Sequence, residues 1–261
     1  MFYVGTAGYS YEDWKGIYYP EDLDKKEYLG FYAKEFDFTE VNSTYYKMPN
    51  KFMLYHMQKK TPDNFQFVIK AHRGLTHKRE DNDKLFNEFR EALQPLIEVD
   101  KLGCILAQFP TSFRNRDENR DYLRDFRERM GDIPIVIEFR HEEWIDDRVF
   151  DLLEEEHLGY VCVDEPQFKT LVPPTVWATS DIGYVRFHGR NYKKWWHHEK
   201  THERYDYLYS KGELEDWVPH ILKLSSKTKK TFVSMNNHYR AQAVINGRML
   251  RKMIEKEVVL T

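Results

Sequence analysis

The apolar runs of this chain repeatedly end in charged or amide side chains, the residue types that transfer protons and bind ions. Glu138 and Arg140 lie two positions apart at the end of one run, and Arg186 and His188 lie two positions apart at the end of another. Because side chains alternate along a strand, each such pair would point to the same face. The spacing therefore predicts a carboxylate, two guanidinium groups and an imidazole around one site.

This residue set is typical of acid–base chemistry on an anionic substrate, because arginine binds phosphate and carboxylate groups through two hydrogen bonds. Glu138 is the candidate general base, held by Arg140, and His188 is the candidate acid or base that faces it. Asp164 is the third catalytic candidate. The candidate substrate-binding residues are Glu40, Asn42, Tyr45, Lys70, His72, Gln108, Arg140, Arg186, Arg190, Asn236 and Asn237.

The predicted pocket is positive although the chain as a whole is not. Basic side chains and histidines outnumber acidic side chains at the strand tips; they are Lys70, Arg140, Arg186, Arg190, His72 and His188 against Glu40, Glu138 and Asp164. The whole chain has a formal net charge of -3, which excludes attraction of nucleic acid by a general positive field. A small anionic ligand is therefore the expected partner.

A divalent metal is a weaker alternative at the same positions. His72, Asp164, Glu138 and His188 are acceptable ligands for zinc or manganese. No H-E-x-x-H or paired-cysteine spacing is present, and the histidines between residues 189 and 210 are more simply explained as a solvated loop. No cofactor motif is present either, so the cofactor stays undefined.

Eight short runs rich in Val, Ile and Phe predict eight strands. They are Tyr3–Thr6, Phe38–Ser43, Gln66–Ala71, Cys104–Phe109, Ile135–Phe139, Tyr160–Val163, Gly183–Phe187 and Thr231–Met235. The gaps between them are long enough for helices, and residues 85–97 have apolar positions at helical spacing. Repeated strand–helix units with right-handed crossovers predict a TIM (β/α)8 barrel of the α/β class.

An open, doubly wound sheet is the competing interpretation, but the chain lacks the G-x-G-x-x-G turn that such a sheet often carries. In a barrel, the carboxyl ends of the strands surround the active site, which is where the polar tips fall. The long irregular stretch from Gly189 to Ser210 is rich in Trp and His, and we expect it to cover the mouth.

The polar tips could instead form a purely structural network, because buried charges must be paired. Glu138, Arg140, Arg186 and Asp164 would then simply neutralise one another. Apolar layers fill the lower lumen of most barrels and could replace such a network with little loss of stability. That comparison favours a functional pocket.

Short motifs in a fixed order extend over nearly the whole chain. They are Gly5-Thr6-Ala7-Gly8-Tyr9-Ser10-Tyr11 with Trp14 and Tyr18-Tyr19-Pro20, Glu40-Val41-Asn42-Ser43-Thr44-Tyr45-Tyr46, Thr76-His77, Gln108-Phe109-Pro110, Glu138-Phe139-Arg140-His141 with Trp144, Arg186-Phe187-His188-Gly189-Arg190 and Asn236-Asn237-His238. Together they resemble the DUF72 family, also called YecE-like. The resemblance implies one TIM-barrel domain over residues 1–261 and leaves the biochemical role open. Tyr9 stands where the family usually has Trp, and Ala241 where a Gly commonly follows the Asn-Asn motif.

The leading hypothesis is an enzyme of the hydrolase, lyase or isomerase class acting on a phosphate-bearing or carboxylate-bearing substrate. A nucleic-acid-binding or phosphodiester-cleaving barrel is an alternative by analogy with barrel endonucleases. A glycosidase using Glu40, Glu138 or Asp164 is a third hypothesis, and a non-catalytic binding protein is a fourth.

Cysteine content and hydropathy indicate the compartment. Cys104 and Cys162 each lie inside an apolar run, as expected for reduced, buried thiols. No run approaches about twenty apolar residues, the length needed to span a bilayer. We expect a cytoplasmic protein with no membrane partner.

Overall fold

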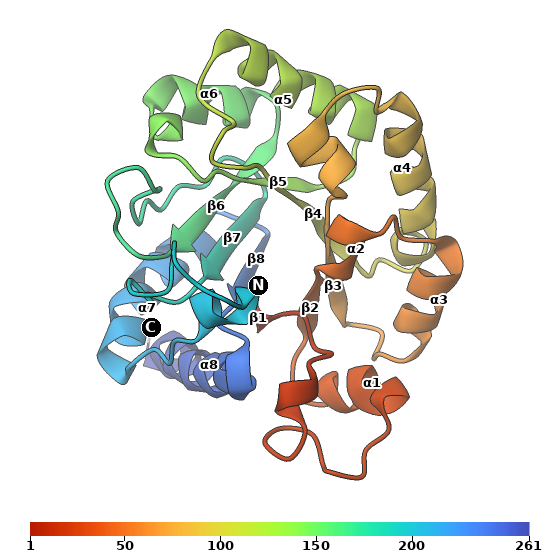
Figure 1. The fold of residues 1–261 in the computed structure, drawn as a ribbon, viewed down its shortest axis with the longest axis vertical. Helices are drawn as coiled ribbons and strands as arrows, with labels where there is room; N and C mark the ends of the chain where they lie inside the picture. The colour runs from red at the N-terminus through yellow and green to blue at the C-terminus, as the bar shows by residue number, and fades with distance from the viewer. Residues whose placement is uncertain (261) are drawn as a thin grey trace.

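A computed structural model describes residues 1–260 and shows a closed barrel of parallel strands in the order β1 to β8 (Figure 1). The strands are β1 (Phe2–Ala7), β2 (Phe38–Val41), β3 (Gln66–Lys70), β4 (Leu102–Gln108), β5 (Ile135–Glu138), β6 (Leu158–Asp164), β7 (Ile182–Phe187) and β8 (Lys230–Met235). Pairing of β1 with β8 closes the barrel. The predicted TIM barrel is confirmed, and each predicted strand overlaps an observed one.

Helices surround the barrel and cover the outer faces of the strands (Figure 1). They are α1 (Tyr28–Tyr32), α2 (Ser43–Tyr46), α3 (Lys51–Lys59), α4 (Asp83–Ile97), α5 (Asp117–Met130), α6 (Asp147–Glu155), α7 (Lys211–Ser225) and α8 (Gln242–Leu260). In α4 the buried side chains Phe86, Phe89, Leu93 and Leu96 follow the predicted stripe. No helix in residues 1–260 is both long enough and apolar enough to cross a membrane.

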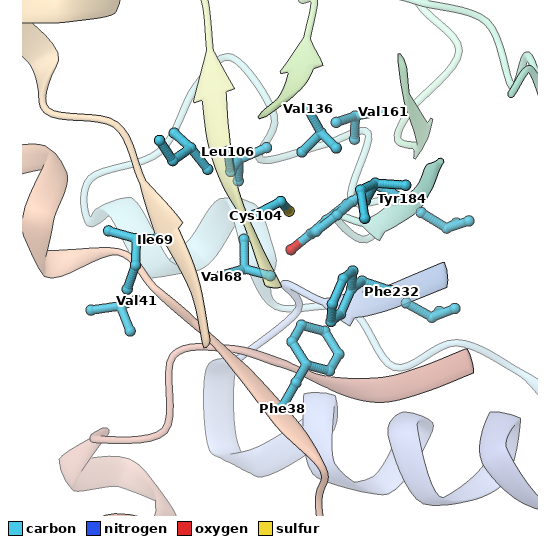
Figure 2. Packing of buried hydrophobic residues seen from close by; sticks show 14 of the residues in the cluster. Phe38, Val41, Val68, Ile69, Cys104, Leu106, Val136, Val161, Tyr184 and Phe232 are labelled. Atoms are coloured by element: carbon cyan, nitrogen blue, oxygen red, sulfur yellow. The ribbon is translucent and has the colours of Figure 1, made fainter. Parts of the chain in front are cut away.

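The barrel interior is apolar toward the amino ends of the strands and polar toward their carboxyl ends. Figure 2 shows part of the apolar layer, which includes Cys104, Leu106 and Tyr184. On several strands an inward apolar or aromatic residue is followed two positions later by a polar one; the pairs are Phe38 and Glu40, Val68 and Lys70, Leu106 and Gln108, Val136 and Glu138, Tyr184 and Arg186, and Phe232 and Ser234. Strand register then places the polar residues at one level, because Gln108 lies opposite Glu138 and Arg186 opposite Ser234.

The segment between β7 and α7 packs against the tip of β7. Its Trp195 is buried, and the centroids of the Trp195 and His188 rings are 6.4 Å apart. The segment ends at Ser210, which forms a capping box with Glu213 and so starts α7. The predicted cap therefore covers His188.

Candidate functional site

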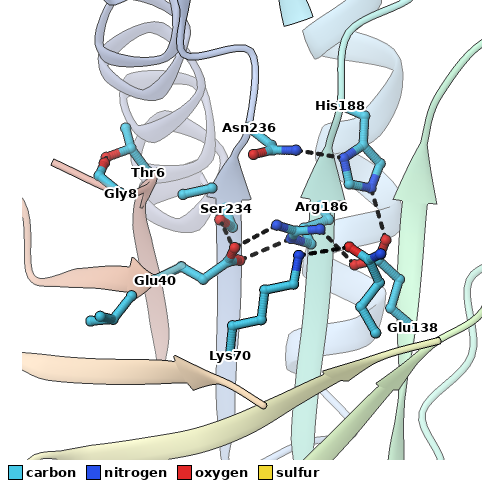
Figure 3. Close-up of polar contacts among 12 residues, drawn as sticks. Thr6, Gly8, Glu40, Lys70, Glu138, Arg186, His188, Ser234 and Asn236 are labelled. Atoms are coloured by element: carbon cyan, nitrogen blue, oxygen red, sulfur yellow. Dashed lines mark hydrogen bonds and ion pairs between the residues drawn. The ribbon is translucent and has the colours of Figure 1, made fainter. Parts of the chain in front are cut away.

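Arg186 is the centre of a buried ionic network in the lumen (Figure 3). Its guanidinium binds both carboxylate oxygens of Glu40, with Nε donating to Oε2 at 2.9 Å, and Nη1 donates to Oε2 of Glu138 at 2.7 Å. Tyr184 and Ser234 also donate to Glu40 Oε2, at 2.9 Å and 3.2 Å. Burial alone would lower the pKa of Arg186, but Glu138 and Glu40 hold it well above its usual value. Arg186 is therefore a permanent cation.

Glu138 binds three neighbouring groups. Arg186 contacts one of its oxygens, and Arg140 Nη2 and His188 Nε2 lie 2.7 Å and 3.2 Å from the other. Burial would raise the pKa of Glu138, but Arg140, Arg186 and His188 together hold it well below its usual range. Glu138 is thus an ionised anchor for the two arginines. This environment does not favour the predicted role of general base.

His188 is neutral in this site, because burial and the neighbouring Arg140 lower its pKa to about 3. The ionised Glu138 can only accept hydrogen bonds, so the proton of His188 must be on Nε2. The amide of Asn236 then donates to Nδ1 over 2.9 Å. His188 is fixed in one tautomer between Asn236 and Glu138.

Arg140 connects this network to two groups at the mouth. Its Nη1 donates to Glu165 Oε2 at 2.7 Å, and its Nη2 lies 3.4 Å from Gln108 Oε1, which also accepts from Lys70 Nζ at 2.9 Å. Burial raises the pKa of Glu165 to about 7. Burial and the charge of Arg186 lower the pKa of Lys70 to about 7. Two groups that titrate near neutrality therefore lie on either side of the Arg140–Gln108 contact.

Lys70 occupies an unusual environment for a lysine. Its side chain is partly buried, and its hydrogen-bond partner, Gln108, is uncharged. The ammonium group lies 5.1 Å from the centre of the Tyr45 ring, which in turn packs edge-on against His77. In the described network, Arg140 and Arg186 each contact carboxylates, whereas Lys70 does not.

Three buried polar atoms around the mouth have no hydrogen-bond partner among the described residues. They are Nε of Arg140, Oε1 of Glu165 and Oδ1 of Asn42, the residue that follows β2. Buried polar groups in folded proteins are nearly always paired, so unpaired ones deserve a functional explanation. One donor and two acceptors in this region are thus left without a partner among the described residues.

Eight of the predicted site residues belong to this inner network: Glu40, Lys70, Gln108, Glu138, Arg140, Arg186, His188 and Asn236. Asn42 and Tyr45 lie at its rim. His72 does not join it, because its Nδ1 accepts the backbone N–H of Gly74 at 3.2 Å.

The prediction that Asp164 shares the pocket with Glu138 and His188 is wrong. In the register of β6 and β7, Val163 lies opposite the inward Arg186, whereas Asp164 lies opposite Phe187, which contacts Trp217 of α7. The carboxylate of Asp164 faces the helices and accepts from Trp217 Nε1 at 2.7 Å. It therefore belongs to the outer wall of the barrel.

Arg190 and Asn237 also lie outside the lumen. Arg190 forms two hydrogen bonds with Asp164, of 2.9 Å and 2.6 Å, because the backbone turns at Gly189 with a φ of 89° and ends the alternation along β7. Asn237 donates to the backbone carbonyl of Tyr207 and to the side chain of Asn246 in α8. Both residues hold the loop before α7 against the barrel.

These placements correct the predicted charge of the pocket. The inner network contains three basic side chains, Lys70, Arg140 and Arg186, and three carboxylates, Glu40, Glu138 and Glu165. His188 is neutral, and Arg190 is neutralised by Asp164. The expected excess of positive charge is absent from this set.

Glu165 is the main residue that the sequence analysis missed. Val161, Val163 and Glu165 share the inward face of β6 and its extension, since Val161 lies opposite Tyr184 and Val163 opposite Arg186. That alternation is hidden in the sequence, because β6 is apolar on both faces.

The predicted metal ligands do not converge. Within residues 1–260, no group of three or more His, Cys, Asp or Glu side chains has an arrangement that could hold a metal ion. Glu138 and His188 are in the lumen, Asp164 is in the outer wall, and His72 is turned to its own loop.

A profile of the family described as "Protein of unknown function DUF72" matches residues 3–260. The chain belongs to the DUF72 family. UPF0759 protein YunF of Bacillus subtilis (strain 168) is 32% identical over 98% of this chain and 96% of its own length. UPF0759 protein YecE of Escherichia coli (strain K12) is 26% identical over 55% of this chain and 50% of its own length. The solved structure of a DUF72 family protein from Thermotoga maritima is 39% identical, with a TM-score of 0.90 over 98% of this chain and 99% of that one.

The backbone at position 241, where the resemblance implies a Gly, has an unusual conformation in this DUF72 chain. Ala241 has a φ of 58° and the preceding Arg240 a φ of 48°, so both lie in the left-handed region. Glycine adopts that region without the steric cost that a Cβ atom brings. The glycine expected from the resemblance would therefore relieve strain at this position.

Proposed function

We propose that this chain is an enzyme that transfers protons on a small, anionic substrate at the carboxyl ends of β3, β5 and β6. The observation that supports this most is the pairing of Lys70 and Glu165 across Arg140 and Gln108, with the pKa of both groups near 7. General acids and bases work best when their pKa is close to the working pH. A hydrolase, lyase or isomerase would each need such a pair.

The substrate's carboxylate or phosphate would bind beside Lys70 and the free Nε–H of Arg140. The Nε–H of Arg140 has no partner, and the ammonium group of Lys70 donates to an amide oxygen, so neither donor is bound to a carboxylate of the protein. Because its pKa lies near 7, Lys70 can act as an acid in its charged form and as a base in its neutral form.

Glu165 would serve as the partner of Lys70. Because its pKa lies near 7, Glu165 can give a proton when protonated and accept one when ionised, through the unpaired Oε1. Arg140 would be held in position by Glu138, which is itself fixed by Arg186 and Glu40. His188 would hold Glu138 in place. These are positioning roles.

The chain offers a matched control for Lys70. Lys230 also donates to a glutamine amide oxygen, that of Gln66 at 3.0 Å, but it begins β8 and therefore lies at the opposite end of the barrel from the proposed site. Both lysines are partly buried. Changing either one to Met removes the same ammonium group from opposite ends.

We expect phosphate-bearing or carboxylate-bearing small molecules to raise the melting temperature of the wild-type protein by several degrees when present at about 100 times their Kd. Lys70→Met should abolish the rise, and Lys230→Met should preserve it. Thermal unfolding against a panel of inorganic phosphate, short carboxylates and sugar phosphates measures the effect. A rise that persists in Lys70→Met, or a panel without any rise in the wild type, would contradict the proposal.

A further inference from the structure

We propose that Lys70 forms a covalent imine with an aldehyde or ketone substrate, an inference that rests on the proposed function and names its substrate class. Three geometric features support it: a partly exposed lysine side chain at a strand tip, an uncharged hydrogen-bond partner for its amine, and an unpaired guanidinium N–H on Arg140 for an anionic group of the same substrate.

The surroundings of Lys70 keep its amine available. The charged and titratable groups around it are Glu40 on β2, Tyr45 on α2, His77 in the turn after β3, Glu138 at the end of β5, Arg140 just beyond β5, and Arg186 on β7. Both guanidinium groups disfavour the ammonium form, and both carboxylates are already bound by those arginines. Lys70 consequently has no carboxylate contact that would hold its proton.

The perturbed pKa agrees with this geometry. At a pKa of about 7, half of the Lys70 side chains are neutral amines at pH 7. An unperturbed lysine is neutral in only about one molecule in several thousand at that pH. Only the neutral amine is nucleophilic, so the lowered pKa raises the reactive fraction of Lys70 at neutral pH.

The step balances with groups that the site supplies. The lone pair of the Lys70 amine attacks the carbonyl carbon, a C–N bond forms, and the electron pair of the C=O bond moves to oxygen. A proton passes from nitrogen to that oxygen to give a carbinolamine. Loss of the hydroxyl group as water, with a proton supplied by an acid such as Glu165, leaves the C=N bond. Hydrolysis reverses these steps and restores the amine.

The substrate class follows from the two binding elements. A carbonyl carbon must reach Lys70 while a carboxylate or phosphate of the same molecule binds the free donor of Arg140. A short keto acid or a phosphorylated aldehyde or ketone has both groups. An imine would withdraw electrons from the neighbouring carbon, and that chemistry suits a lyase or isomerase better than a hydrolase.

Reductive trapping tests the inference in the intact wild-type protein. Pyruvate is the probe and sodium cyanoborohydride the reductant, and peptide mass spectrometry reports the modified fraction at each lysine. We expect Lys70 to be modified at least ten times faster than Lys230 at pH 7, with a rate that rises through a midpoint near pH 7. Equal rates at Lys70 and Lys230 would overturn the inference, and this comparison needs no variant to fold.

A second comparison separates this inference from the proposed function. Lys70→Arg keeps a cation for anion binding but cannot form an imine under these conditions. We expect it to lose trapping at position 70. In the wild-type protein, the ligand-induced rise in melting temperature reports anion binding, whereas trapping reports the imine. If the wild type shows the rise without trapping at Lys70, the imine is wrong while the acid–base proposal stands; loss of the rise together with trapping would refute both.

Discussion

Within the described residues, the lumen contains three carboxylates but only two guanidinium groups. Because the cations are shared unequally, the pKa of Glu138 and the pKa of Glu165 shift in opposite directions. Glu138 contacts Arg140, Arg186 and His188, whereas Arg140 is the one of these three that contacts Glu165. Burial therefore dominates at Glu165 and raises its pKa, while the cations dominate at Glu138 and lower its pKa. Divergent pKa values in one cluster are how a site obtains both an acid and a fixed anion.

This difference predicts a pH-dependent effect of Glu165→Gln on stability. The pKa of Glu165 is raised from 4.5 to about 7 on folding, so the folded state binds the extra proton between those values. Its contribution to stability is complete below pH 4.5 and is lost as pH rises through 7. Glutamine lacks this titration, so the variant should gain roughly 2 kcal/mol relative to the wild type between pH 5 and pH 8.

Urea unfolding of both proteins at pH 5 and pH 8 measures this change. Glu118→Gln is the control, because that side chain is 72% exposed and its contact with Arg116 is long, at 3.7 Å. We expect the control to show no comparable shift. A stability difference between Glu165→Gln and the wild type that is equal at both pH values would refute the assignment.

At the scale of elements, the sequence was most informative where a strand is amphipathic. Glu138 with Arg140, and Arg186 with His188, alternate with apolar residues, and both pairs lie inside the barrel as predicted. Strand β6 is buried on both faces and carries no such alternation, so its acidic residue was assigned by type and not by face. The sequence also could not predict which charged side chains pair with one another, because the pairing depends on the register between strands that are distant in sequence.

Boundaries follow the same logic. The predicted strand Phe38–Ser43 ends two residues earlier, at Val41, because Asn42 takes helical dihedral angles and Ser43 begins α2. This early turn brings Tyr45 over Lys70, with the Thr44 hydroxyl bonded to the Lys70 carbonyl at 2.6 Å. The strand count was predictable from hydropathy alone, whereas this short helix was not.

The end of α6 offers a prediction about element stability. His157 is exposed and has a φ of 51°, in the left-handed region, where it connects α6 to β6. His157→Gly should stabilise the fold by about 0.5–1 kcal/mol, because glycine accepts this conformation without strain. Urea denaturation provides the comparison. Asp151→Gly, at an exposed position inside α6, should instead destabilise by about 0.5–1 kcal/mol, and the same sign for both variants would count against the explanation.

At the scale of the whole molecule, closure of the barrel depends on small side chains on β1. The inward residues Gly5 and Ala7 lie beside β2 and β8, where Phe38 and Phe232 occupy the lumen. A Cβ atom on Gly5 would lie 2.3 Å from the backbone oxygen of Phe38 and 2.9 Å from its ring. The large Phe38 side chain on β2 therefore fits only because Gly5 on the neighbouring β1 has no side chain.

We expect Gly5→Ala to destabilise the protein by at least about 2 kcal/mol, because backbone contact cannot relax as a flexible side chain can. Gly212→Ala is the control: nothing lies within 4 Å of its added Cβ, and the position is inside α7. That variant should gain about 0.5–1 kcal/mol from helix propensity. Thermal and urea unfolding give both values. If Gly5→Ala were as stable as the wild type, the contact between β1 and β2 would not be as tight as proposed.

Asp164 and Glu165 are consecutive, yet they serve opposite sides of the barrel wall. One carboxylate binds Arg190 and Trp217 on the outside, and the other binds Arg140 in the lumen. The peptide unit that joins them therefore places one carboxylate on each face of the barrel wall. The loop that carries Arg190 and the proposed acid Glu165 are thus anchored through adjacent residues of the chain.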